Sequence, residues 1–127
     1  MTVTVMLVDD SKLARIVAGK TLAALQPDWA RVEASNADEA LDIVAKQNVD
    51  VAILDYNMPG RDGLDLAAEL RASHPEMPIA IITANIQDEI IARARAINAT
   101  FVGKPVTTEG ISGFISGAAL RLKQARK

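Results

Sequence analysis

The sequence predicts an α/β fold in which helices cover both faces of a parallel sheet, forming a three-layer sandwich. Five short runs rich in β-branched residues alternate with five longer segments of helical composition along the chain. The runs at residues 3–8, 51–54 and 79–82 are almost continuously apolar, which is typical of strands buried on both faces. Strands that alternate with helices in this way indicate parallel β-α-β units rather than hairpins.

Local signals place each element along the chain. We expect strands at residues 3–8, 31–34, 51–54, 79–83 and 100–103, and helices at residues 11–26, 36–47, 63–73, 87–97 and 108–124. The second helix opens on Asn36 with Glu39 three residues later, which is the pattern of a capping box. The third helix is expected to end near His74, because a residue that precedes a proline disfavours the α region.

Composition narrows the class of protein. A chain of 127 residues, half of them apolar, is long enough to bury a core and is expected to form one domain over residues 1–127. The absence of cysteine excludes disulfides and thiolate metal sites and fits a reducing compartment. A net charge of −2 gives no electrostatic reason for nucleic acid as a direct partner. With no apolar stretch near the ~20 residues that span a bilayer and no signal peptide, we expect a cytoplasmic chain without a membrane partner.

Polar side chains stand where the predicted strands end. The first strand is followed by Asp9 and Asp10, the third by Asp55, and the fifth by Lys104, while the fourth ends in Thr83. Ligands of an open parallel sheet bind outside the carboxyl ends of its strands. These five side chains are therefore expected to meet at one edge of the sheet.

The chemistry of this set indicates a cation and a phosphoryl group. Carboxylates in one crevice repel one another unless they are protonated or bind a cation. A donor set of oxygens without histidine or cysteine suits Mg²⁺. An ammonium and a hydroxyl across from the metal would hold a phosphoryl group. The residues alone therefore predict a Mg²⁺-dependent phosphoryl site built on carboxylates.

Four segments resemble a known family. They are LVDDS at residues 7–11, LDYNMPGRDG at residues 54–63, ITA at residues 82–84 and KP at residues 104–105. In this order along the whole chain, they resemble the motifs of response-regulator receiver domains of two-component signalling. The resemblance implies a flavodoxin-like fold with strand order 2-1-3-4-5, the order of a chemotaxis regulator. It also implies a signalling switch that catalyses only its own phosphorylation and dephosphorylation, and not an enzyme acting on other molecules.

The resemblance assigns metal and acceptor roles by position. Asp55 would accept the phosphoryl group. Asp10 and Asp55 would bind Mg²⁺ directly, together with the backbone carbonyl of Asn57. Asp9 would act largely through a metal-bound water.

The resemblance assigns the remaining site residues as well. Thr83, the backbone amide of Ala84 and Lys104 would contact the phosphoryl oxygens. Thr83 and Phe101 would form the switch, because movement of Thr83 toward the phosphoryl group opens space for the aromatic ring. This would change the surface of the fourth helix, fifth strand and fifth helix for partner binding. The Lys104–Pro105 bond is expected to be cis.

Partners follow from the same resemblance. The phosphoryl donor would be a histidine kinase or a histidine phosphotransfer protein, and the recipient a downstream protein target or output domain, with a homodimer as a further candidate. On the first helix we expect a buried stripe formed by Ala14, Val17, Ala18, Thr21, Leu22 and Leu25. Leu13 and Ile16 would then be exposed beside the active-site edge, where the donor docks.

Two departures from the family pattern concern the last two helices. Gly110, Gly113 and Gly117 fall on about one face of the fifth helix, and each lowers helix stability by about 1 kcal/mol relative to alanine. We expect this face to pack on the chain's own sheet, with a partner helix or a second copy as the alternative. The glycine that often ends the fourth helix is replaced by Asn98, which tolerates a left-handed cap.

Two other function classes use related residues. A haloacid-dehalogenase-type phosphatase also forms an aspartyl phosphate with threonine and lysine. That class needs a second acid two residues after the nucleophile, where this chain has Asn57. A flavodoxin-like flavin binder would need aromatic walls, and the chain has one Trp, one Tyr and two Phe. Multiple turnover on a phosphate ester would indicate the phosphatase, and visible absorbance the flavoprotein.

Overall fold

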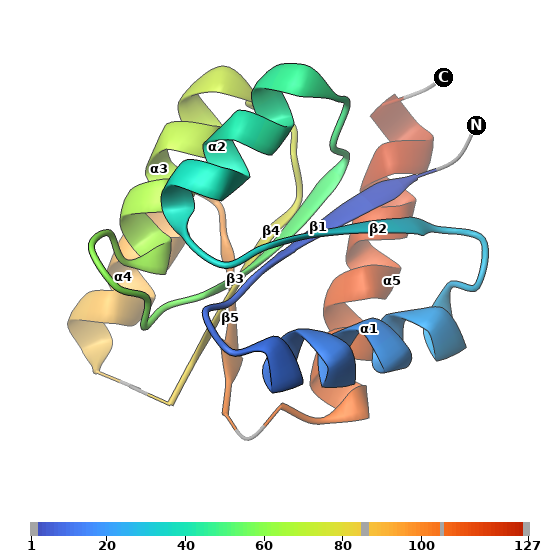
Figure 1. Cartoon of the computed structure of the whole chain (residues 1–127), viewed down its shortest axis with the longest axis horizontal. Helices are drawn as coiled ribbons and strands as arrows, with labels where there is room; N and C mark the ends of the chain where they lie inside the picture. Colours follow the sequence, from blue (N-terminus) through green and yellow to red (C-terminus); the bar gives the residue numbers. More distant parts are fainter. Residues whose placement is uncertain (1–2, 85–86, 105, 126–127) are drawn as a thin grey trace.

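The computed structural model describes residues 3–84, 87–104 and 106–125, and it has the predicted three-layer arrangement (Figure 1). The strands are β1 (Thr4–Val8), β2 (Ala30–Ala34), β3 (Val51–Asp55), β4 (Ile79–Thr83) and β5 (Thr100–Gly103). The helices are α1 (Lys12–Leu25), α2 (Ala37–Lys46), α3 (Gly63–Ser73), α4 (Asp88–Ala96) and α5 (Thr108–Ala125). Pro105, whose peptide bond is expected to be cis, lies outside the described residues.

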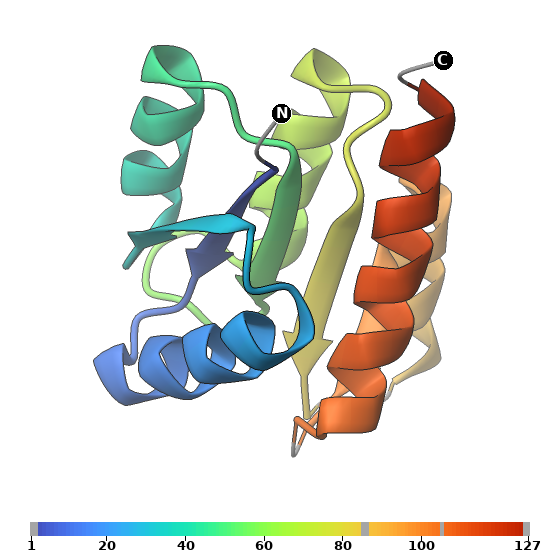
Figure 2. The same cartoon turned by 90° about the vertical axis from the view of Figure 1, so that its right-hand side faces the viewer.

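The described strands form one parallel sheet in the order β2-β1-β3-β4-β5, so the predicted flavodoxin-like topology is confirmed. Helices α2, α3 and α4 cover one face of this sheet, and α1 and α5 cover the other (Figures 1 and 2). Every residue of β3 and β4 is buried, which explains their continuous apolar sequences. Within the described ranges, no helix is both long enough and apolar enough to cross a membrane.

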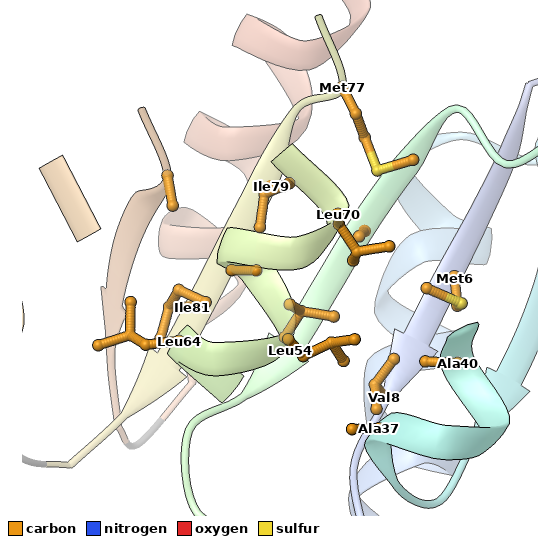
Figure 3. Close-up of a cluster of buried hydrophobic side chains, with 14 of the residues drawn as sticks. Met6, Val8, Ala37, Ala40, Leu54, Leu64, Leu70, Met77, Ile79 and Ile81 are labelled. Carbon is orange, nitrogen blue, oxygen red and sulfur yellow. The ribbon is translucent and has the colours of Figure 1, made fainter. Parts of the chain in front are cut away.

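Two apolar clusters hold the layers together. The cluster between the sheet and α2, α3 and α4 contains Met6, Leu54 and Leu70 (Figure 3). The cluster on the other face contains Leu22 of α1 and Phe114 of α5. Because both faces of the central strands are used for packing, their polar ends are the part of the sheet left for chemistry.

Helix α2 begins as the capping pattern predicts, with one difference. The backbone N–H of Glu39 donates to Oδ1 of Asn36 at 2.8 Å. The carboxylate of Glu39 accepts from the backbone N–H of Ser35 at 2.7 Å and from its hydroxyl at 2.6 Å. These hydrogen bonds lower the pKa of Glu39 below its ordinary value. The return bond therefore reaches one residue further back than in a capping box, and it ties α2 to the end of β2.

Helix α4 ends on the left-handed residue that the sequence suggests. Asn98 has a φ of 55°, a conformation that asparagine tolerates better than most residues. Arg71 of α3 donates from Nε to the carbonyl of Ile97 at 2.7 Å and from Nη2 to that of Asn98 at 3.2 Å. Its Nη1 also donates to the carbonyl of Pro75 at 2.9 Å. One arginine thus satisfies carbonyls at the ends of both α3 and α4.

The exposed face of α1 is wider than predicted. Leu13 is 70% exposed and Ile16 is 42% exposed, as expected. Val17, which is predicted to be buried, is 54% exposed, so that part of the prediction is wrong. Val17 lies about 140° around the helix from the fully buried Leu22, too far for both side chains to face the sheet.

The glycines of α5 also differ from expectation. Only Gly110 approaches its own sheet: a Cβ atom there would lie 3.5 Å from Cγ1 of Val102. At Gly113 and Gly117 a Cβ atom would have no neighbour within 4 Å, so the expected close packing is wrong for these two. The sheet-facing side of α5 is occupied instead by Ile111, Phe114, Ile115 and Ala118. Gly113 and Gly117 line an open groove of about 430 Å³.

Candidate functional site

The connection from β1 to α1 carries two adjacent carboxylates. Oδ1 of Asp9 accepts from the backbone N–H of Ser11 at 2.9 Å. Ser11 in turn caps α1, because its hydroxyl oxygen accepts from the backbone N–H of Ala14 at 3.2 Å. The short turn therefore places half-buried Asp9 and exposed Asp10 side by side at the carboxyl end of β1.

A third carboxylate comes from the end of the central strand. Asp55 is the last residue of β3, and its side chain is 4% exposed. The chain then turns back, with the N–H of Gly63 donating to the carbonyl of Tyr56 at 2.9 Å. A Cβ atom on Gly63 would overlap the carbonyl oxygen of Asp55 and lie 3.0 Å from Cα of Tyr56. A glycine is therefore required at Gly63, because the start of α3 presses directly on the backbone of Asp55.

The ends of β4 and β5 supply a hydroxyl and an ammonium. Thr83 is completely buried, and its carbonyl accepts from the backbone N–H of Lys104 at 3.0 Å. Nζ of Lys104 lies 2.8 Å from Oδ1 of Asp55. This contact is an ion pair without hydrogen-bond alignment, and Oδ1 has no hydrogen-bond partner among the described residues. The edge thus holds a buried carboxylate oxygen whose charge is balanced by the ammonium of Lys104.

The three carboxylates form one cluster. Oxygen atoms of Asp9, Asp10 and Asp55 all lie within 4.8 Å of one another. Burial raises the pKa of Asp9 above its ordinary value, and the charges of Asp55 and Asp10 act in the same direction. The hydrogen bond from Ser11 and the charge of Lys104 lower it only in part. The cluster is an unfavourable concentration of negative charge that a bound cation would relieve.

The donor set fits a hard divalent cation. Carboxylate oxygens on a partly open edge, with room for water, are what Mg²⁺ requires, because it keeps several of its waters. Oδ1 of Asp55 makes no hydrogen bond within the described residues, which is consistent with a role as a metal ligand. Asn57, whose backbone carbonyl is the fourth expected ligand, is exposed in the loop after β3.

The expected switch residues lie on the neighbouring strands. Phe101 of β5 is paired with Ile81 of β4, two residues before Thr83. Because side chains alternate along a strand, Phe101 and Thr83 are on the same face of the sheet. Phe101 is half-buried, and exposed Ala84 follows Thr83 at the edge. The structure therefore brings the predicted site residues to one end of the sheet.

Sequence reasoning missed one residue beside this cluster. Arg15 of α1 donates from Nη1 to the backbone carbonyl of Asp9 at 2.6 Å, and from Nε to Glu33 of β2 at 2.8 Å. No motif marks it, because its partner on Asp9 is a backbone atom. The sequence shows only that an arginine lies six residues after Asp9, close enough to reach the turn between β1 and α1.

Comparisons with known proteins agree with this geometry. The family model described as response regulator receiver domain matches residues 5–115. The positive alginate biosynthesis regulatory protein of Pseudomonas aeruginosa is 35% identical over 119 residues, covering 91% of this chain and 46% of that protein. The chain spans less than half the length of the first curated relatives it matches. These matches do not favour the phosphatase alternative.

Solved structures show the same fold. The chemotaxis protein CheY4 of Vibrio cholerae matches with a TM-score of 0.83 and 26% identity, covering 93% of this chain and 99% of that one. A response regulator receiver domain protein from Clostridium thermocellum matches with a TM-score of 0.87 and 25% identity, covering 97% of this chain and 98% of that one.

Proposed function

The chain belongs to the family of response regulator receiver domains, and we propose that Asp55 is the residue on which it accepts a phosphoryl group. As a member of this family it is a signalling domain of the response-regulator class. The observation that carries the proposal is the buried Asp55 oxygen, 2.8 Å from Nζ of Lys104 and clustered with two further carboxylates.

The proposed reaction is transfer of a phosphoryl group from a phosphohistidine to Asp55. A carboxylate oxygen of Asp55 attacks the phosphorus of a phosphohistidine, a P–O bond forms, and the P–N bond breaks. The released imidazole keeps the bonding electron pair and takes a proton from water. The negative charge on the phosphoryl oxygens is stabilised by the ammonium of Lys104, the hydroxyl of Thr83 and the backbone amide of Ala84. Water later hydrolyses the acyl phosphate and resets Asp55.

We further propose that Mg²⁺ is held by Asp10 and Asp55, by the backbone carbonyl of Asn57, and by Asp9 through water. When bound, the cation supplies positive charge next to the phosphoryl oxygens. Asp10→Ala should abolish both Mg²⁺ binding, measured by calorimetry, and phosphorylation, because too few charged ligands remain. Mg²⁺ binding that survives the loss of Asp10 would show that the ligand set is wrong.

The proposed output follows from the positions of Thr83 and Phe101. Thr83 moves toward the phosphoryl group, Phe101 turns inward, and the surface of α4, β5 and α5 changes for a downstream protein target, an output domain or a second copy. A receiver domain over residues 1–127 accounts for all of these elements. Phe101→Ala should leave phosphorylation of Asp55 intact while removing the difference in partner binding between the two states.

The proposed donor, a histidine kinase or histidine phosphotransfer protein, docks on α1. Leu13, Ile16 and Val17 form an exposed apolar patch on the helix that follows Asp9 and Asp10. Leu13→Ser with Ile16→Ser should slow transfer from a phosphohistidine donor roughly tenfold, as expected for loss of central apolar contacts. Phosphorylation by acetyl phosphate should be unchanged. Leu120→Ser on α5 removes an equally apolar, 58% exposed side chain and serves as the control.

The experiment that tests the proposed function is phosphorylation by acetyl phosphate. Intact mass should increase by one phosphoryl group (about 80 Da) in the wild type with Mg²⁺, and the adduct should form on a carboxylate. Asp55→Asn should show no adduct under the same conditions. An adduct that persists in Asp55→Asn, or an absence of any adduct in the wild type, would contradict the proposal.

A further inference from the structure

Arg15 connects three elements next to the acidic cluster. Its Nη1 donates to the backbone carbonyl of Asp9 at 2.6 Å, and its Nε donates to Oε1 of Glu33 at 2.8 Å. The side chain is only 15% exposed, although it carries a full positive charge. A planar guanidinium can make both bonds at once in fixed directions, which an ammonium cannot. The side chain therefore joins α1 and β2 to the turn between β1 and α1 that carries Asp9 and Asp10.

The bond to Asp9 has consequences for Asp10. The carbonyl of Asp9 belongs to the planar peptide unit that also carries the nitrogen of Asp10. The backbone N–H of Asp9 donates to the carbonyl of Ala34 at 3.1 Å, and its carbonyl accepts from Arg15. With both peptide groups of Asp9 held, the backbone dihedrals between them have little freedom. The direction in which Asp10 leaves the strand, and its position relative to Asp9, are set by these two bonds.

We propose that Arg15 is a positioning residue for the Mg²⁺ ligands, an inference that rests on the proposed function. Arg15 acts through the backbone of Asp9, by fixing the orientation of the two adjacent carboxylates before the cation binds. Partners of this kind around metal ligands commonly affect metal affinity by 10- to 100-fold.

The charge of Arg15 predicts the opposite effect. A cation next to an acidic cluster repels Mg²⁺, so its removal by electrostatics alone would increase Mg²⁺ affinity. Loss of positioning decreases affinity instead, because the carboxylates must be ordered when the cation binds. The sign of the change therefore separates the two roles of Arg15.

The test is a direct titration of the full chain with Mg²⁺ alone, followed by calorimetry or NMR shifts. Arg15→Met keeps the volume of the side chain, and Arg15→Lys keeps the charge. Both should weaken Mg²⁺ binding, Arg15→Met by roughly tenfold. Phosphorylation by acetyl phosphate should recover toward the wild-type extent at saturating Mg²⁺, because Arg15 does not touch the phosphoryl group.

Arg61→Ala is the matched control. Arg61 lies in the loop after β3 at the same edge of the sheet, and its guanidinium bonds to Glu69 and the carbonyl of Asp65. Its removal deletes a positive charge without touching the turn of Asp9, so Mg²⁺ affinity should not fall. Circular dichroism and urea unfolding establish that each variant is folded at the temperature of the titration. If Arg15→Met does not fold, Arg15→Lys decides the outcome.

Several results would overturn the inference. Mg²⁺ affinity that is unchanged or higher in Arg15→Met would leave Arg15 only an electrostatic role. Wild-type affinity in Arg15→Lys would show that the two directed bonds of the guanidinium are not required. A loss in Arg61→Ala equal to that in Arg15→Met would show that the effect is not specific to Arg15. Failure of the proposed function is distinct, because the wild type itself would then bind no Mg²⁺ and accept no phosphoryl group.

Discussion

Two regions of this molecule contain residues that stability alone would not favour, and the structure accounts for only one of them. At the carboxyl edge of the sheet, three carboxylates lie within 4.8 Å of one another, beside a glycine that no larger residue can replace without displacing the backbone. On α5, Gly113 and Gly117 occupy helical positions with open space around them. At the sheet edge, the clustered carboxylates and Gly63 each have close neighbours. On α5, a Cβ atom at Gly113 or Gly117 would have no neighbour within 4 Å.

The unfavourable residues at the sheet edge are explained by specific contacts. The carboxylate of Asp9 accepts from the backbone N–H of Ser11, that of Asp55 lies against Lys104, and Arg15 holds the backbone carbonyl of Asp9. The crowding at Gly63 results from the same close approach of α3 to Asp55. The described part of α5 shows no contact that would require Gly113 or Gly117.

Filling the crowded position at Gly63 should have the largest effect on stability. Gly63→Ala would place a Cβ atom against the carbonyl of Asp55, so the start of α3 or the end of β3 must move. We expect the free energy of unfolding to fall by about 1–3 kcal/mol, measured by urea denaturation, with slower phosphorylation of Asp55. Unfolding like that of the wild type would mean that the loop after β3 is less tightly packed than the structure shows.

The same substitution on α5 should have the opposite sign. Gly113→Ala and Gly117→Ala each replace a glycine that has no neighbour with a better helix former. Each should raise the free energy of unfolding by about 1 kcal/mol in the same urea assay. If Gly113→Ala is destabilised, the space around position 113 is not open as the structure shows.

A large side chain at position 117 of α5 tests whether this face of the helix binds a second copy of the chain. Gly117→Leu should fold normally, because a side chain there enters the open groove. Sedimentation with and without a phosphoryl mimic then tests whether this face binds a second copy. Association equal to the wild type in both states would exclude the face of Gly113 and Gly117 as an interface between copies.

The smallest effect concerns the charge of Asp9. Because its pKa in the folded protein is raised, the folded state binds this proton more readily than the unfolded chain. Above that pKa, the charged carboxylate therefore lowers the free energy of unfolding. Without Mg²⁺, Asp9→Asn should be slightly more stable than the wild type at neutral pH. The gain should disappear below the ordinary pKa of aspartate, where the carboxyl is protonated in both states.

Asp28→Asn, at an exposed turn before β2, is the matched control for this charge change. It should not reproduce the pH-dependent gain. A destabilised Asp9→Asn at neutral pH would mean that the hydrogen bond from Ser11 outweighs the burial and repulsion of the carboxylate.

Much of the fold could be predicted from the sequence because its signals are local. The signals are the apolar runs between helical segments, the cap at Asn36 and the proline after His74, and each acts over a few residues. Each element therefore lies within a few residues of its predicted bounds. The position of Asp55 at the end of a buried strand could be predicted for the same reason. The strand order came from the resemblance, since pairing of distant strands leaves no local mark.

The failed predictions depend on tertiary contacts. Val17 is apolar and at helical spacing, but which side of α1 faces the sheet is decided by packing around Leu22. On α5, Ile111, Phe114, Ile115 and Ala118 face the sheet, so Gly113 lies on another side of the helix. Arg15 and Arg71 both act on backbone carbonyls, and a side chain's bond to a distant backbone atom cannot be inferred from residue types.

The central claim is that the acidic edge accepts a phosphoryl group on Asp55, and direct mapping of the modified residue tests it best. After treatment with acetyl phosphate and Mg²⁺, borohydride reduces an aspartyl phosphate to homoserine, which peptide mass spectrometry locates. We expect homoserine at position 55 alone, and none when Mg²⁺ is removed by a chelator. Homoserine at Asp9 or Asp10, or a phosphoryl group that resists borohydride on another residue, would contradict it.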